Sequence, residues 1–202
     1  MRIPSRLVES KSAAWDRLAG PGDWWTGEER LAFAAEARAA FAERHQAPWL
    51  RTAPAGLMSK LAADANQIDR SWATESISEV GEAAYVELVA IAASIAVLDA
   101  FAEALGVERT PLPTAREGEP TRREPEDMGD AGAYVRMTTP WSDANVARAL
   151  TLSPSGNALY RGIAMPFYHE GQFLDLAWDR PISRPQAEAV ATAVSAANEC
   201  FY

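Results

Sequence analysis

The sequence is poor in the residues that form disulfides and metal sites. Its 202 residues include one cysteine, Cys200, and two histidines, His45 and His169. A single cysteine excludes an intrachain disulfide framework. Apart from the weak pair of His169 with Glu170, neither histidine has a cysteine, histidine or acidic neighbour at metal-ligand spacing, so we expect no bound metal. The chain also lacks a glycine-rich loop of the kind that cradles phosphate groups.

Positive charge is scarce as well. The chain carries 19 Lys and Arg against 28 Asp and Glu, a net charge of −9 at pH 7, and no basic stripe. Binding to nucleic acid and to anionic membrane surfaces both depend on clustered positive side chains. We therefore expect no nucleic-acid partner and no membrane partner.

Long apolar runs are missing too. The first six residues are not followed by the apolar stretch of a secretory signal. The longest apolar run, residues 88–98, lies between Glu87 and Asp99 and is too short to span a bilayer. The expected compartment is the cytoplasm, where a lone thiol stays reduced.

What the sequence does contain is typical of a globular helical protein. Hydrophobic residues make up 48% of the chain and charged residues 23%. Alanine is abundant, runs of β-branched residues are few, and long stretches follow a 3.6-residue period, so the expected fold class is all-α. Helices are expected over residues 5–19, 26–44, 56–65, 70–80, 82–105, 143–152, 154–167 and 184–197.

Two of these helices have strong local signals. Thr26 followed by Glu29 is the signature of a capping box at a helix start. The helix over 82–105 is apolar nearly all round in its middle and is followed by Gly106, a residue that commonly ends helices. We expect this long helix to be the buried centre of the first lobe.

The character of the chain changes after the long helix. Residues 109–142 have no helical period and are rich in charge, proline and glycine, which is typical of a linker over the surface or partly disordered. The expected organisation is an N-terminal helical lobe over 1–108 without thiols, a linker over 109–142, and the start of a C-terminal lobe over 143–202.

The last twenty residues carry the most specific pattern. Ser183 with Gln186 three positions later predicts a capped helix start, and apolar residues recur at helical spacing as far as Ala197. Asn198 is a suitable residue to end that helix. Cys200 follows the break, where a thiol at the start of a new helix has a lowered pKa and raised reactivity.

Glu188, eleven further residues and then Cys200 form a pattern similar to that of the alkylhydroperoxidase (AhpD)-like, or carboxymuconolactone decarboxylase-like, family. That pattern places a glutamate twelve positions before the first cysteine of a Cys-x-x-Cys pair, and a histidine four positions after the second. The stretches 22–30 and 36–40 resemble the two-lobed alkylhydroperoxidase-related (seleno)protein branch. Many members of that branch carry a cysteine pair after this helix, whereas residues 41–46 here have no thiol.

The chain departs from the pattern, because the second thiol and the histidine would fall beyond Tyr202. We hypothesise that the next position is selenocysteine, whose codon is otherwise read as a stop. The alternative is a true terminus in a degenerate relative. The resemblance thus implies an AhpD-like helical fold of two lobes, the second incomplete.

The resemblance also implies a function, a peroxidase-related oxidoreductase that reduces organic hydroperoxides. A relay would run from Glu188 through the histidine to the second thiol or selenol, with Cys200 as the resolving thiol. Such an enzyme needs an external thiol reductant and no bound cofactor, and it is often a homo-oligomer. The 202-residue chain alone would be inactive.

Other interpretations remain open at this point. The chain could be a non-catalytic helical scaffold or interaction protein of the same fold. It could also be a ring-opening lactone decarboxylase, although nothing in the sequence positions acid–base groups for that reaction. Taken singly, Cys200 is typical of a buried small hydrophobe and Glu188 of a solvated carboxylate near a helix start.

Overall fold

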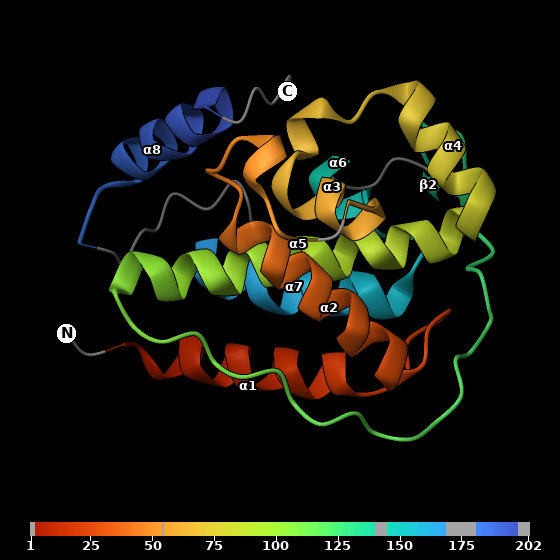
Figure 1. Cartoon of the computed structure of the whole chain (residues 1–202), viewed down its shortest axis with the longest axis horizontal. Helices are drawn as coiled ribbons and strands as arrows, with labels where there is room; N and C mark the ends of the chain where they lie inside the picture. Colours follow the sequence, from red (N-terminus) through yellow and green to blue (C-terminus); the bar gives the residue numbers. More distant parts are fainter. Residues whose placement is uncertain (1–2, 54, 140–144, 169–180, 198–202) are drawn as a thin grey trace. The chain divides into compact units, whose positions relative to one another are not determined.

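The structure is a computed structural model that describes residues 3–53, 55–139, 145–168 and 181–197 (Figure 1). It divides into two compact units, residues 1–167 and residues 168–202, which we describe separately. The prediction of an all-α fold is confirmed. The described residues form eight α-helices, two short 3-10 helices and one two-stranded antiparallel sheet.

Most helix bounds agree with the sequence prediction. The α-helices are α1 (Ser5–Ala19), α2 (Gly27–Ala42), α3 (Leu57–Ala63), α4 (Arg70–Val80), α5 (Glu82–Leu105), α6 (Asn145–Arg148), α7 (Pro154–Tyr168) and α8 (Arg184–Ala197). The 3-10 helices are η1 (Pro48–Leu50) and η2 (Ala65–Gln67), and the strands are β1 (Met128–Gly129) and β2 (Met137–Thr138). In the sheet Met128 lies opposite Thr138.

The helix ends have the local causes that the sequence indicated. At the start of α2, the Glu29 backbone N–H donates to Thr26 Oγ1 at 3.3 Å and the Thr26 N–H donates to Glu29 Oε2 at 2.9 Å. This is a complete capping box. Gly106 ends α5 in the left-handed region at φ 64°, and Gly81 separates α4 from α5 at φ 90°. Both angles favour glycine, because a side chain would strain the backbone there.

Helix α5 forms the centre of unit 1, as expected, and runs through the middle of the bundle in Figure 1. Its residues Ile91 and Ile95 are fully buried. The same hydrophobic cluster takes in Leu18 of α1 and both Leu159 and Ile163 of α7. A helix expected in the second lobe therefore contributes to the core of the first unit.

This arrangement does not decide the domain boundaries expected at 108/109 and 142/143, which stay a prediction. It does show where residues 109–122 lie. The Arg116 N–H donates to the Ala19 carbonyl at 2.8 Å, and the Arg122 N–H donates to the Asp23 carbonyl at 2.8 Å. The segment is thus an extended strap bonded to the end of α1 and the loop before α2.

By length and composition alone, α5 could cross a membrane. The expectation from the sequence concerned only the shorter run 88–98, which is too short to do so. The apolar character of α5 has another cause in this structure, since its side chains make up much of the core of unit 1.

One expectation needs correction. The helix expected over 143–152 is only the short α6, with residues 143 and 144 outside the described residues, because the chain turns after Arg148. Helix α7 covers the expected range 154–167 and also includes Tyr168. Trp49 on η1 is 83% exposed.

The described part of unit 2 centres on α8. Its start is capped as predicted, because the Gln186 N–H donates to Ser183 Oγ at 3.4 Å and the Ser183 N–H donates to Gln186 Oε1 at 2.8 Å. None of the residues of α8 is buried, and Val190 and Val194 are more than half exposed.

Candidate functional site

Glu188, the predicted proton carrier, lies in the first half of α8. The Tyr168 hydroxyl donates a hydrogen bond to Glu188 Oε2 at 2.8 Å. Arg184 lies one helical turn earlier, and its Nε is 3.5 Å from Glu188 Oε1. The carboxylate is 44% exposed. It is thus held by two partners and remains accessible to solvent.

Burial raises the pKa of the Tyr168 hydroxyl, and the hydrogen bond to Glu188 raises it further. A tyrosine with a raised pKa keeps its proton at neutral pH and acts as a donor. The Tyr168 hydroxyl can therefore act as a hydrogen-bond donor that orients the Glu188 carboxylate. No sequence signal predicted this pair, since twenty residues separate its members and no helical or strand register links them.

Cys200, the second predicted site residue, lies outside the described residues. Its spacing of twelve from Glu188 is therefore a property of the sequence alone. His169 also lies outside the described residues, whereas His45 is in the turn that follows α2. Among the residues that the structure describes, no group of three or more His, Cys, Asp and Glu side chains is placed to hold a metal ion.

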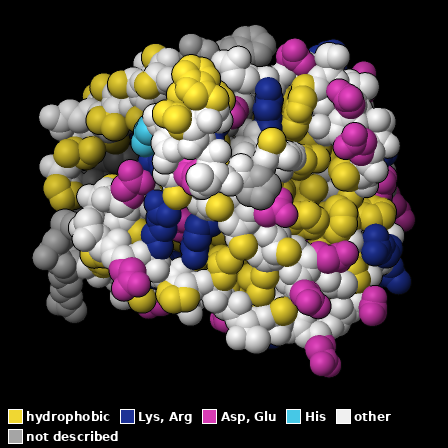
Figure 2. All heavy atoms as spheres, viewed as in Figure 1, with side chains coloured by type: hydrophobic (Ala, Val, Ile, Leu, Met, Phe, Trp, Pro, Cys, Tyr) yellow, Lys and Arg dark blue, Asp and Glu magenta, His cyan; other side chains and the backbone are white. Residues whose placement is uncertain are grey.

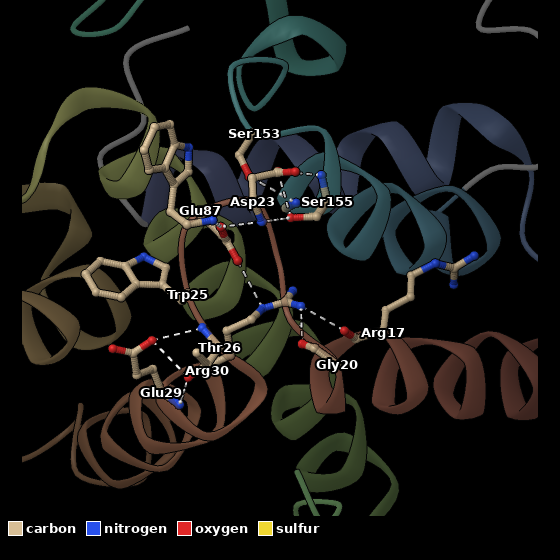
Figure 3. A network of polar contacts seen from close by, with 12 residues as sticks. Arg17, Gly20, Asp23, Trp25, Thr26, Glu29, Arg30, Glu87, Ser153 and Ser155 are labelled. Carbon is tan, nitrogen blue, oxygen red and sulfur yellow. Dashed lines mark hydrogen bonds and ion pairs between the residues drawn. The ribbon is translucent and has the colours of Figure 1, made fainter. Parts of the chain in front are cut away.

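A second polar cluster lies inside unit 1, and no sequence pattern predicted it (Figure 3). Asp23 in the loop before α2 accepts three hydrogen bonds at Oδ2. The donors are the Ser153 hydroxyl at 2.8 Å, the Ser155 hydroxyl at 2.7 Å and the Ser155 N–H at 2.8 Å. Asp23 and Ser153 are at most 5% exposed. The loop is thereby tied to the start of α7.

Glu87 of α5 ties the same loop from the other side. Its Oε2 accepts hydrogen bonds from the N–H groups of Asp23 at 3.0 Å and Trp24 at 2.8 Å. Its Oε1 lies 3.1 Å from Arg30 Nε, although the angle of that contact does not make it a hydrogen bond. Glu87 and Arg30 are buried almost completely. Figure 3 shows the two side chains meeting between α5 and α2.

Arg30 also binds the end of α1, where its Nη1 donates to the carbonyls of Arg17 at 2.9 Å and Gly20 at 2.8 Å. Its Nη2 has no hydrogen-bond partner among the described residues. Burial raises the pKa of Glu87 and lowers the pKa of Arg30, while the charge of each partner opposes the shift. Burial is the larger effect in both groups.

This cluster, which we call the loop clasp, comprises Asp23, Arg30, Glu87, Ser153 and Ser155. Its carboxylates and hydroxyls are enclosed and bonded to one another, so they are poorly placed to meet a substrate. The arrangement instead holds α1, α2, α5 and α7 around one loop. Gly22, Asp23 and Arg30 lie in the stretch that resembled the family branch, and packing explains their presence there.

On the face seen in Figure 2, Lys and Arg side chains are scattered among more frequent Asp and Glu side chains and form no basic patch. Several are paired, as with Arg136, whose guanidinium lies 2.6 Å from Glu82 and 2.9 Å from Glu124.

Comparison with known proteins yields no assignment. No family model, no curated protein and no solved structure matches the chain.

Proposed function

We propose that the chain belongs to an alkylhydroperoxidase-like oxidoreductase that reduces organic hydroperoxides in the cytoplasm with a thiol or selenol pair. The observation that carries this proposal is the sequence spacing of twelve from Glu188, which lies on α8, to Cys200. In the sequence Cys200 follows Asn198, a residue suited to end that helix, so the pattern's first thiol is expected just past the helix.

The surroundings of Glu188 support the proposal. A carboxylate in a proton relay needs a fixed orientation and access to a proton donor. The Tyr168 hydroxyl and the Arg184 guanidinium hold Glu188 from two sides. The exposed part of the carboxylate is open to a partner group such as the histidine of the pattern.

The reaction has three steps. The second thiolate or selenolate attacks one peroxide oxygen, the O–O bond breaks, and the alcohol leaves with a proton passed along the relay from Glu188. The resulting sulfenic or selenenic acid then reacts with the Cys200 thiol, which forms a disulfide or selenosulfide and releases water. An external dithiol reduces that bond and becomes a disulfide itself.

The test begins with the nucleotides after the Tyr202 codon. If the reading frame continues with a cysteine codon or a UGA codon directly after Tyr202, and then with the histidine of the pattern, the longer chain can be expressed with cysteine at the position after Tyr202. We expect thiol-dependent consumption of cumene hydroperoxide by that chain and only background by residues 1–202. Glu188→Gln should lower turnover by about a hundredfold and Cys200→Ser should abolish multiple turnovers, with Glu9→Gln on α1 as the unchanged control.

The second candidate is a non-catalytic helical scaffold or interaction protein. It is favoured by the exposed apolar residues of α8, Val190 and Val194, which suit association. A noncoding sequence after the Tyr202 codon, or a longer chain without peroxidase activity, would support this candidate and overturn the oxidoreductase.

A further inference from the structure

A cavity of about 420 Å³ opens between α3 and α4 in unit 1 and contains no residue of the loop clasp. Its volume lies in the range of small-molecule sites, about 300–1,000 Å³. The side chains that give it chemistry are Lys60, Asp64, Trp72, Glu75, Ser76 and Glu79.

The two walls of the cavity carry opposite charges. Lys60 lies on α3, and Glu75 and Glu79 lie one turn apart on α4. Asp64 is already neutralised by Arg51, whose Nη1 is 2.6 Å from its Oδ2. Within the described residues, Lys60, Glu75 and Glu79 form no ion pair, although they line one cavity. The Lys60 ammonium and the Glu75 and Glu79 carboxylates can therefore form ion pairs with a charged ligand in the cavity.

Trp72 and Ser76 supply the rest of a binding site. The Lys60 ammonium lies 5.6 Å from the centroid of the Trp72 ring, a cation–π contact that holds the lysine against the aromatic wall. Ser76 is 6% exposed and lines the cavity, and its hydroxyl makes no hydrogen bond to another described residue. That hydroxyl can therefore donate a hydrogen bond to a polar group of a ligand in the cavity, or accept one from it.

We propose that this cavity binds a small zwitterion, an amino acid or short peptide with a free ammonium and a free carboxylate. The carboxylate of the ligand pairs with Lys60, and its ammonium pairs with Glu75 and Glu79. The body of the ligand lies against the Trp72 ring, and a polar group bonds to the Ser76 hydroxyl. A ligand with a single charge would pair either with Lys60 or with Glu75 and Glu79. The charged groups on the other wall would stay unpaired, so such a ligand should bind more weakly.

The test is isothermal titration calorimetry of the full chain with trialanine and its capped forms. Trialanine amide keeps only the positive charge, N-acetyl-trialanine keeps only the negative charge, and the doubly capped peptide keeps neither. We expect trialanine to bind, each single cap to weaken binding about tenfold, and the doubly capped form to give no heat. These comparisons use the unmodified protein and so do not depend on a variant's folding.

Charge variants then locate the binding. Glu75→Gln/Glu79→Gln should weaken trialanine and its amide but not N-acetyl-trialanine. Lys60→Met should weaken trialanine and N-acetyl-trialanine but not the amide. The control is Glu9→Gln on α1, outside the cavity, which should change none of the three affinities.

Several outcomes would overturn the proposal. They are no heat with trialanine at about 10 mM, equal affinity for trialanine and a singly capped form, or unchanged trialanine affinity in both charge variants. The inference is independent of the proposed oxidoreductase, since the residues that line the cavity include neither Glu188 nor Tyr168.

Discussion

Gly22 stands against the carboxylate of Glu87, and the space there allows no side chain. A Cβ atom at position 22 would lie 1.7 Å from Glu87 Oε1 and 2.6 Å from its Cδ. Because Glu87 is enclosed and bonded to the loop, it cannot withdraw without loss of those bonds. Gly22→Ala should therefore lower the free energy of unfolding by about 3 kcal/mol, as measured by urea titration.

Gly56→Ala is the matched control for this substitution. A Cβ atom at position 56 would meet nothing within 4 Å, and its φ of −177° is extended backbone that any residue adopts. Because Gly56 is the N-cap of α3 and alanine is a poorer N-cap residue, we expect a loss of about 1 kcal/mol or less, well below that at Gly22. Equal effects at the two glycines would show that Gly22 does not pack against a fixed carboxylate.

The buried ion pair of Arg30 and Glu87 predicts a non-additive double-mutant cycle. Arg30→Met and Glu87→Gln should each lower the free energy of unfolding by about 3–5 kcal/mol, because each leaves one buried charge uncompensated. The double variant removes both charges, and its glutamine carbonyl still accepts the N–H groups of the loop. It should lose less than the sum of the singles by about 1–3 kcal/mol. Additive losses in urea titration would contradict a direct pairing.

Tyr85 on α5 predicts a stability loss at alkaline pH. Burial, with a smaller effect of Tyr134, raises the pKa of Tyr85 from 10.0 to about 12. The folded protein holds this phenol proton more tightly than the unfolded chain. The protonated Tyr85 phenol therefore contributes its full share to the free energy of unfolding below about pH 10. This share declines by about 2 kcal/mol as the pH rises to about 12.

Urea titrations from pH 9 to about pH 12 would measure this decline in the parent and in Tyr85→Phe. The variant should lose most of the decline, because phenylalanine has no proton to release. Tyr160, whose pKa burial also raises, would leave a smaller slope of the same sign. Identical slopes in the two proteins would contradict the burial of the Tyr85 hydroxyl.

At the scale of elements, the cap of α2 makes a measurable contribution. The hydrogen bonds of Thr26 lower the pKa of Glu29, so the capping box is stronger with the carboxylate ionised. Thr26→Ala should lower the free energy of unfolding by about 1 kcal/mol at pH 7, and the difference should shrink as the pH falls below the usual value of 4.5 for glutamate. Thr26→Ser is the control, because it keeps the accepting hydroxyl. A pH-independent loss would contradict the coupling.

Helix positions were predictable because their signals are local. The bounds of α1, α4 and α5 and the start of α8 follow from caps, glycines and the 3.6-residue period, which need only neighbouring residues. The loop clasp was not predictable, since Asp23 and Ser153 are 130 positions apart and a polar residue in a loop has no period. The cavity between α3 and α4 was missed for a related reason, as the period of each helix does not determine which charged faces meet. A spacing pattern predicts Glu188 as a site residue, and that stays a prediction; its hydrogen-bond partner Tyr168 had no such signal.

At the scale of the whole molecule, the core of unit 1 is built from both ends of its sequence. Leu18, Ile91 and Ile163 belong to one hydrophobic cluster, and α7 also supplies a serine hydroxyl that holds Asp23. A fragment that ends at residue 108 lacks α7 and the serines that donate hydrogen bonds to Asp23. Its Asp23 carboxylate would then be buried without those donors, or the core around it would open to solvent. We therefore expect the folding unit to extend to residue 167.

A fragment of residues 1–167 should unfold cooperatively, with a free energy of unfolding close to that of unit 1 in the full chain. A fragment of residues 1–108 should show no cooperative transition, because it loses the apolar surface that Leu159 and Ile163 bury and the hydrogen bonds of the loop clasp. Urea titration followed by circular dichroism and by tryptophan fluorescence would measure both. Independent folding of residues 1–108 would instead favour the lobe boundary expected from the sequence, and α7 would then be an addition to a core that is already complete.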